Sequence, residues 1–250
     1  MSLAGRGVLV TRPRELSRGL AALVERAGGR AIVFPAIEIE ALPQPEPALR
    51  RGPFDLVVFV SLSAVDKGFR WAGAGAKVLA VGSGTRAELA KRGVPGAIAP
   101  LAGADSEALL ALPELARVQG KRILIVRGEG GRALLGDTLA ARGARVEYAE
   151  CYRRVRPRAD PAPLLAAWER GELHAVTVSS GEALDNLRAM LGASGERRLR
   201  ETPLFVPHER VAAQAASMGV REVLVAGPAD DEMLERLVAY FSDERRPAGS

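Results

Sequence analysis

The chain has 250 residues, 48% of them hydrophobic and 26% charged, which is typical of a globular protein with a sizeable core. Its single cysteine, Cys151, excludes an internal disulfide framework or a cysteine cluster for zinc, and no apolar run approaches the ~20 residues of a membrane-spanning helix. The formal charge of +5 comes almost entirely from arginine and favours anionic partners, whereas 4% aromatic residues argues against the stacking surfaces of single-strand nucleic-acid binders.

The N-terminal part alternates short apolar runs with amphipathic segments. Residues 8–10 predict a buried strand, and residues 15–27 carry apolar side chains at helical spacing up to the stop signal Gly28-Gly29. A second strand is predicted over 31–34. Residues 37–40 then alternate apolar and charged side chains, which favours an exposed or two-stranded ribbon.

The same alternation continues through the middle of the chain. Buried strands are predicted over 55–61 and 77–81, and a short strand over 97–100. Ser61 and Asp105 are suitable caps for the helices that follow them. Strands alternating with helices predict an α/β fold with parallel sheets and right-handed crossovers.

The segment that begins at Ile123 repeats the opening of the chain. Arg12 matches Arg127 and Gly28 matches Gly143 at one constant offset of 115 residues (127 − 12), without a gap. Further on, residues 175–180 repeat 56–61, and residues 203–206 repeat 77–80. A period this long is too long for a solenoid unit and predicts two copies of one α/β design.

Small hydroxyl residues and glycines stand at the ends of several predicted strands, where parallel sheets bind ligands and helix N-termini offer free N–H groups. They are Thr11, Ser61, Ser63, Gly82, Ser83, Thr85, Ser179 and Ser180. These residues mark four strand ends, at 11, 61–63, 82–85 and 179–181. The run from Arg127 and Gly128 to Arg132 marks a fifth. All of them could present backbone amides to anions, and the alternative for each is an ordinary helix cap.

Motifs for nucleotide, metal or covalent chemistry are weak. Residues 128–131 lack the third glycine of a dinucleotide fingerprint, and no Walker lysine follows Gly82. Neither His174 nor His208 has a partner at metal-ligand spacing, which favours capping or surface roles. Cys151 has no histidine constellation to recommend it as a nucleophile.

Tyr152 stands out by its position. It lies in the predicted ribbon at 150–154, where a phenol could face a cleft between two lobes and donate a hydrogen bond or a proton. The alternative is packing at the junction between the lobes.

Several short motifs, taken in order, carry a family resemblance. They are Val8-Leu-Val-Thr-Arg-Pro13, Phe34-Pro-Ala-Ile37, Asp55-Leu-Val-Val-Phe-Val-Ser61, Ala80-Val-Gly82 with Thr85, Arg127-Gly-Glu-Gly-Gly-Arg132 and Glu150-Cys-Tyr152. In this order the chain resembles the uroporphyrinogen-III synthase family almost to its end.

The resemblance implies a fold of two similar flavodoxin-like α/β lobes with parallel sheets, joined by a two-stranded β ribbon. The first lobe would comprise 1–36 and 153–242, and the second 40–150. Residues 243–250 would form a disordered tail.

The resemblance also implies a cofactor-free, cyclizing lyase that makes uroporphyrinogen III from hydroxymethylbilane, a linear tetrapyrrole with eight carboxylates. Tyr152 matches the family tyrosine proposed to assist hydroxyl departure, and Thr85 matches a family threonine at the cleft. At the equivalent helix start of the other lobe the family often has threonine, whereas this chain has Arg210 preceded by His208, so these two side chains are candidate substrate contacts. Arg12, Arg127 and Arg132 are candidate carboxylate contacts, with a structural role as the alternative.

The expected setting is a cytoplasmic monomer in tetrapyrrole biosynthesis that contacts hydroxymethylbilane synthase transiently and binds neither nucleic acid nor membrane. Two rival functions stay open at this point. One is a two-lobed sensor or transport-type protein that closes on an anionic ligand without chemistry. The other is a nucleotide-dependent α/β transferase.

Overall fold

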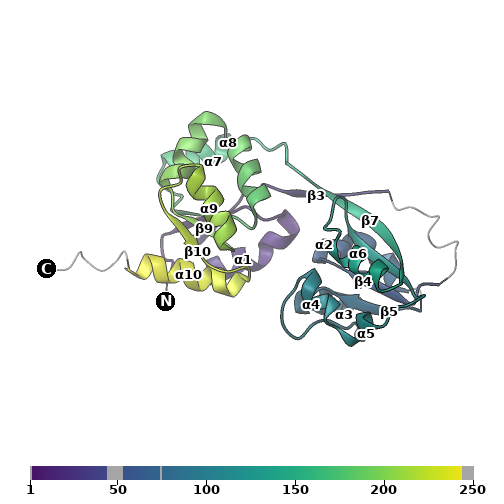
Figure 1. Cartoon of the computed structure of the whole chain (residues 1–250). Helices are drawn as coiled ribbons and strands as arrows, with labels where there is room; N and C mark the ends of the chain where they lie inside the picture. Colours follow the sequence, from purple (N-terminus) through teal and green to yellow (C-terminus); the bar gives the residue numbers. More distant parts are fainter. Residues whose placement is uncertain (1, 44–52, 74, 244–250) are drawn as a thin grey trace. The chain divides into compact units, whose positions relative to one another are not determined.

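The computed structural model describes residues 2–43, 53–73 and 75–243, which form two compact units (Figure 1). The first unit comprises 1–38 and 155–250, and the second comprises 39–154. Whether the predicted ranges 1–36 with 153–242 and 40–150 behave as separate domains stays a prediction. The predicted disordered tail lies outside the described residues except for Asp243. No described helix is both long enough and apolar enough to cross a membrane.

The first unit contains a five-stranded sheet in the order β10-β9-β8-β1-β2, and its strand pairs are parallel. Its strands are β1 (Gly7–Val10), β2 (Arg30–Val33), β8 (Ala175–Thr177), β9 (Leu204–Val206) and β10 (Val223–Val225). Its helices are α1 (Arg14–Arg26), α7 (Ala162–Glu169), α8 (Gly181–Glu201), α9 (Glu209–Ser217) and α10 (Asp230–Asp243).

The second unit contains a sheet in the order β3-β7-β6-β4-β5. Its strands are β3 (Glu38–Ala41, whose first residue belongs to the first unit), β4 (Leu56–Phe59), β5 (Lys77–Ala80), β6 (Arg122–Gly128) and β7 (Arg145–Val155). Its helices are α2 (Leu62–Gly68), the 3₁₀ helix η2 (Phe69–Gly73), α3 (Ser83–Lys91), α4 (Ser106–Leu110), α5 (Pro113–Ala116) and α6 (Leu134–Ala141).

Both sheets bury their central strands, which explains the unbroken apolar runs in the sequence. In β4, Val57 and Phe59 join one hydrophobic cluster with residues of α2, η2 and α3. Leu56 and Val58 point to the opposite face and join a cluster with residues of α4, α5 and α6. In the first unit α1 and α10 lie side by side and share a cluster with Val8 and Val10 of β1 (Figure 1).

The strand registers confirm the predicted duplication. In the first sheet Val8 of β1 pairs with Ala175 of β8. In the second sheet the equivalent residues, Ile123 of β6 and Leu56 of β4, pair in the same way. The other neighbouring strands also pair at equivalent positions. The order β2-β1-β8-β9-β10 of the first sheet therefore matches β7-β6-β4-β5 of the second, where the bridge at Ile98 stands in place of β10.

Two predicted elements differ in the structure. The strand expected over 97–100 is reduced to one parallel bridge between Leu79 and Ile98, since Pro95 precedes this stretch, Pro100 ends it and proline cannot donate to a ladder. The ribbon expected over 150–154 continues a strand that begins at Arg145. The whole segment forms one strand, β7, which pairs with β6 along most of its length. β3 lies beside β7 in the sheet, and a separate ribbon joining the lobes stays a prediction.

The turn after α1 gives a testable consequence of the repeat. Gly28 has a φ of +82° and its counterpart Gly143 has +85°, a left-handed conformation that L side chains rarely adopt. Because a Cβ on Gly28 would meet only ordinary contacts at 3.7 Å, Gly28→Ala should lower the free energy of unfolding by about 1 kcal/mol through backbone strain alone. Urea denaturation measures this. Gly84→Ala, at a helical glycine with open space around it, is the control and should not destabilise. Equal stabilities of the two variants would contradict the prediction.

Candidate functional site

A pocket of about 320 Å³ opens at the carboxyl ends of β4, β5 and β6 within the second unit. This is the edge at which open parallel sheets bind ligands. The residues that line it are Val60, Ser61, Val81, Ala104, Asp105, Ser106, Ile125, Arg127, Gly128, Glu129, Gly130, Gly131, Arg132, Leu135, Tyr148, Tyr152 and Arg154. Five residues predicted from the sequence are thereby brought together: Ser61, Arg127, Gly128, Arg132 and Tyr152.

Tyr152 forms part of the pocket wall. It belongs to β7, only 3% of its surface is exposed, and its hydroxyl lies 3.0 Å from Ser61 Oγ. A Cβ on Gly128 would come within 2.6 Å of the Tyr152 ring, so glycine at this position leaves room for the ring. The phenol is therefore held at its oxygen by Ser61 and at its ring by the close packing against Gly128 of β6.

Ser61 caps α2 and contacts the phenol with the same oxygen. Its Oγ accepts a hydrogen bond from the N–H of Ala64 at 2.9 Å. With that bond in place, the Ser61 hydroxyl can still either donate to Tyr152 or accept from it. If Ser61 donates, the proton of Tyr152 is left for a group bound in the pocket.

Arg127 is held by groups of its own unit. Its Nε and Nη2 donate to Glu150 Oε1 at 3.2 and 2.9 Å, and its Nη1 donates to the carbonyls of Gly131 and Arg132 at 3.2 and 3.3 Å. Its guanidinium carbon lies 4.0 Å from the centre of the Tyr148 ring. Only 14% of the Arg127 side chain is exposed.

The segment from Glu129 to Arg132, which we call the glycine loop, forms the rim of the pocket. Its first amide, on Glu129, donates to the carbonyl of Tyr152 at 2.8 Å, and Gly130 takes a left-handed φ of +68°. Among the described residues, the N–H groups of Gly130 and Arg132 have no hydrogen-bond acceptor, whereas the N–H of Gly131 closes the turn at 129–130. Arg132 is exposed and forms no ion pair with a described residue. The loop thus offers both amides and a cation to an anion.

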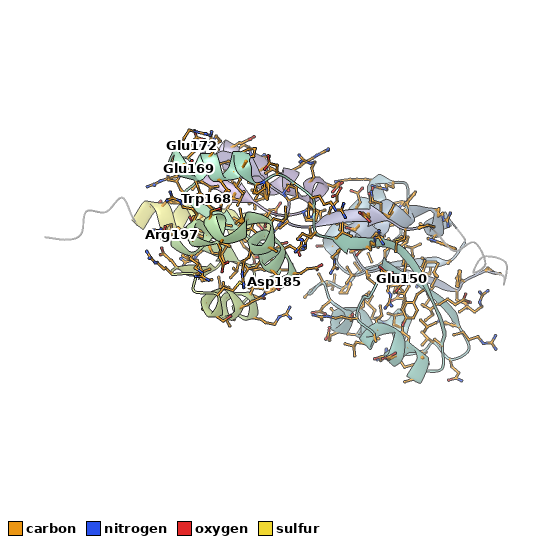
Figure 2. All side chains as sticks on the ribbon, turned by 90° about the horizontal axis from the view of Figure 1, so that it is seen from above. Glu150, Trp168, Glu169, Glu172, Asp185 and Arg197 are labelled. Atoms are coloured by element: carbon orange, nitrogen blue, oxygen red, sulfur yellow. The ribbon has the colours of Figure 1, made fainter. Side chains whose placement is uncertain are left out.

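Some of the acidic side chains in or beside this pocket already form hydrogen bonds or ion pairs. Asp105 caps α4 by accepting from the N–H of Ala108 at 2.8 Å. Glu150, labelled in Figure 2, is engaged by Arg127. Glu129 remains exposed at the rim.

The other residues predicted for the second unit lie outside the lining of this pocket. Ser63 is half-buried in the first turn of α2. Gly82 caps α3, and a Cβ there would meet the side chain of Ala104 at 2.7 Å, so glycine lets the segment at Ala104 approach α3. Ser83 is exposed, and Thr85 is 5% exposed in the first turn of α3.

In the first unit, Thr11 and Arg12 directly follow the carboxyl end of β1. Thr11 is fully buried and donates its hydroxyl to the carbonyl of Thr177 at 2.8 Å, which joins β1 to β8. Arg12 forms an ion pair with Asp230 and donates to the carbonyl of Pro228 at 3.0 Å. Arg12 therefore resembles its counterpart Arg127 in engaging both a carboxylate and a carbonyl.

The remaining predicted residues are at helix starts of the first unit. Ser180 caps α8 by accepting from the N–H of Ala183 at 3.1 Å, and Ser179 beside it is half-buried. His208 occupies the cap position of α9 without a side-chain cap bond. His208 and Arg210 are both exposed.

Several lining residues were not predicted from the sequence, among them Ser106 and Arg154. Sequence reasoning also missed Tyr148 of the lining and Glu150, which bonds Arg127. Both lie on β7, where Glu150 is the register partner of Arg127. Gly7 pairs with Arg30, and their counterparts in the repeat, Arg122 and Arg145, pair in the same way. Continuing this register along both strands leads to Arg127 and Glu150. No group of three or more possible metal ligands occurs among the described residues.

Comparison with known proteins identifies the relatives of this chain. Residues 18–235 match the family model described as uroporphyrinogen-III synthase HemD. The chain is 36% identical to the uroporphyrinogen-III synthase of Escherichia coli over 242 residues, which cover 92% of this chain and 98% of that protein. It is 37% identical to the synthase of Salmonella typhimurium over 244 residues, with the same coverage.

A solved structure supports the fold. A uroporphyrinogen-III synthetase from Helicobacter pylori aligns with a TM-score of 0.58 at 14% identity, covering 96% of this chain and 100% of that one. Sequence and fold therefore agree, and the chain belongs to the uroporphyrinogen-III synthase family.

Proposed function

We propose that this protein is a cyclizing lyase that converts hydroxymethylbilane to uroporphyrinogen III and water. The observation that carries the proposal is a family match along most of the chain together with a rigid phenol in a pocket at the carboxyl ends of the strands. Loss of the hydroxymethyl hydroxyl leaves an azafulvene. The substituted carbon of ring D attacks it to give a spiro intermediate, which fragments and recloses with ring D inverted.

Tyr152 is the proposed donor to the departing hydroxyl. A proton or a strong hydrogen bond on that oxygen lets it leave as water. Ser61, 3.0 Å away, donates to the phenol oxygen in this arrangement and directs the phenol proton into the pocket. Burial of the ring keeps the phenol in place and spares the reaction a reorganisation of solvent.

Carboxylate binding is assigned to the glycine loop and Arg132. The substrate is reactive and closes unaided to the type I isomer, so the main task of the protein is to hold the chain in the conformation that inverts ring D. Rigid amides and arginine forks are suited to this because they fix both the position and the direction of a carboxylate. The second-unit residues Ser63, Gly82, Ser83 and Thr85, and the first-unit residues Thr11, Ser179, Ser180, His208 and Arg210, stay predictions as substrate contacts.

The cellular setting is part of the same proposal. We expect a monomer in the cytoplasm that takes its substrate through a transient contact with hydroxymethylbilane synthase, since a substrate that cyclises by itself is best transferred quickly.

The isomer ratio of the product tests the function directly. Hydroxymethylbilane is generated, the protein is added, and the oxidised products are separated into type I and type III uroporphyrins. Mostly type III product is expected. Only type I product, formed at the rate seen without protein, would contradict the proposal and favour a binding protein for an anionic ligand.

Substituting the phenol tests the mechanism. Tyr152→Phe keeps the ring against Gly128 but removes the donor, so kcat should fall roughly 100-fold with little change in KM. Tyr240→Phe removes a hydroxyl that bonds Glu222 in the first unit and is the matched control. Wild-type kcat and isomer yield in Tyr152→Phe would remove the phenol from the mechanism.

Salt tests the electrostatic part of binding. The Debye length falls from about 30 Å at 0.01 M to 3 Å at 1 M, so contacts between exposed arginines and carboxylates weaken as salt is added. KM for hydroxymethylbilane should therefore rise with ionic strength while kcat at saturation changes less. A KM independent of salt would show that charge contributes little to binding.

A further inference from the structure

Arg127 differs from Arg132 in the bonds that it makes. A guanidinium has five N–H donors, and four of the contacts that Arg127 makes are hydrogen bonds to Glu150, Gly131 and Arg132. One face of its plane also lies over Tyr148. A substrate carboxylate could use this side chain well only by displacing the bonds that it already makes.

These bonds connect three parts of the pocket. Arg127, near the end of β6, and Glu150, in the middle of β7, are register partners. The same guanidinium reaches two consecutive carbonyls of the glycine loop, and the loop's first amide is bonded to Tyr152. A Cβ on Gly131 would approach Arg127 Cδ to 3.3 Å, so the loop is packed closely on this side chain.

We infer that Arg127 and Glu150 are positioning residues that fix the glycine loop, so that its free amides and Arg132, rather than Arg127 itself, meet the substrate. The inference rests on the proposed function for its kinetic consequence. Its structural part concerns the loop alone. The counterpart Arg12 supports it, because that arginine also binds a carboxylate and a carbonyl of its own unit.

Removing the charge of Glu150 distinguishes a positioning role of Arg127 from direct substrate binding, because the two roles predict changes of KM in opposite directions. If Arg127 positions the loop, Glu150→Gln weakens the hold of Arg127 on the glycine loop. The kcat/KM for hydroxymethylbilane should then fall roughly 10- to 100-fold, mainly through a higher KM. If Arg127 binds the substrate directly, the same variant frees its guanidinium and removes a negative charge, so KM should fall. An unchanged or lower KM overturns the inference.

The chain provides a matched control on the same two strands. Glu147 of β7 pairs with Arg122 of β6 at 2.7 Å, at the opposite end of the strands from the pocket. Glu147→Gln therefore makes the same charge change in the same kind of pair. It should leave KM near that of the wild type. An equal rise in KM in both variants would assign the effect to general loss of an ion pair between β6 and β7 and overturn the inference.

Arg127→Lys provides a second kinetic arm. Lysine keeps the charge but cannot bond a carboxylate and two carbonyls in one plane. Loss of kcat/KM comparable to that of Glu150→Gln is expected, and wild-type KM in this variant would overturn the inference.

Hydrogen exchange measures how firmly the glycine loop is held, without any substrate. It therefore distinguishes failure of this inference from failure of the proposed function. The amide of Glu129 is bonded to Tyr152 and should exchange at least severalfold faster in Glu150→Gln than in the wild type or Glu147→Gln. An unchanged exchange rate of this amide in Glu150→Gln would overturn the positioning role of Glu150 and Arg127, even in a protein without synthase activity.

Discussion

Both sheets depend on a central pairing between strands from different copies of the duplicated design. In the first unit β1 pairs with β8, and the hydroxyls of Thr11 and Thr177 donate to the carbonyls of Thr177 and Leu9 at 2.8 and 2.9 Å across that pair. In the second unit β4 pairs with β6. Neither copy can complete a sheet by itself. Pairings this distant in sequence require closure of long loops before they stabilise anything, which slows folding.

The candidate site inherits this constraint. Ser61 comes from the end of β4 in the first copy, whereas Arg127 and Tyr152 come from β6 and β7 in the second copy. The contact of 3.0 Å between Ser61 and Tyr152 therefore exists only when the copies are interleaved. Parallel pairing brings their carboxyl ends to one edge of the sheet, so assembly of the sheet also assembles the pocket.

The sequence was sufficient for most strands and for the duplication, because apolar runs are local and the repeat is visible at a constant offset. The order of the strands came from the structure. The prediction failed at Ile98, where Pro95 and Pro100 limit pairing to one bridge. Tyr152 and Ser61 were found by position. Glu150 was missed because a charge on an apparent ribbon suggests solvent, and only the register places it opposite Arg127.

The arginines show why charge in a sequence is an incomplete guide to an anion site. Arg12 and Arg127 occupy equivalent strand ends, yet both are engaged by carboxylates and carbonyls of their own units. Arg132 is five residues further on and forms no ion pair with a described residue. A reaction controlled by orientation needs contacts that do not move, and a contact stays fixed when something behind it holds it. In the second unit we infer that Arg127, held by Glu150, provides that rigidity and that Arg132 binds the ligand.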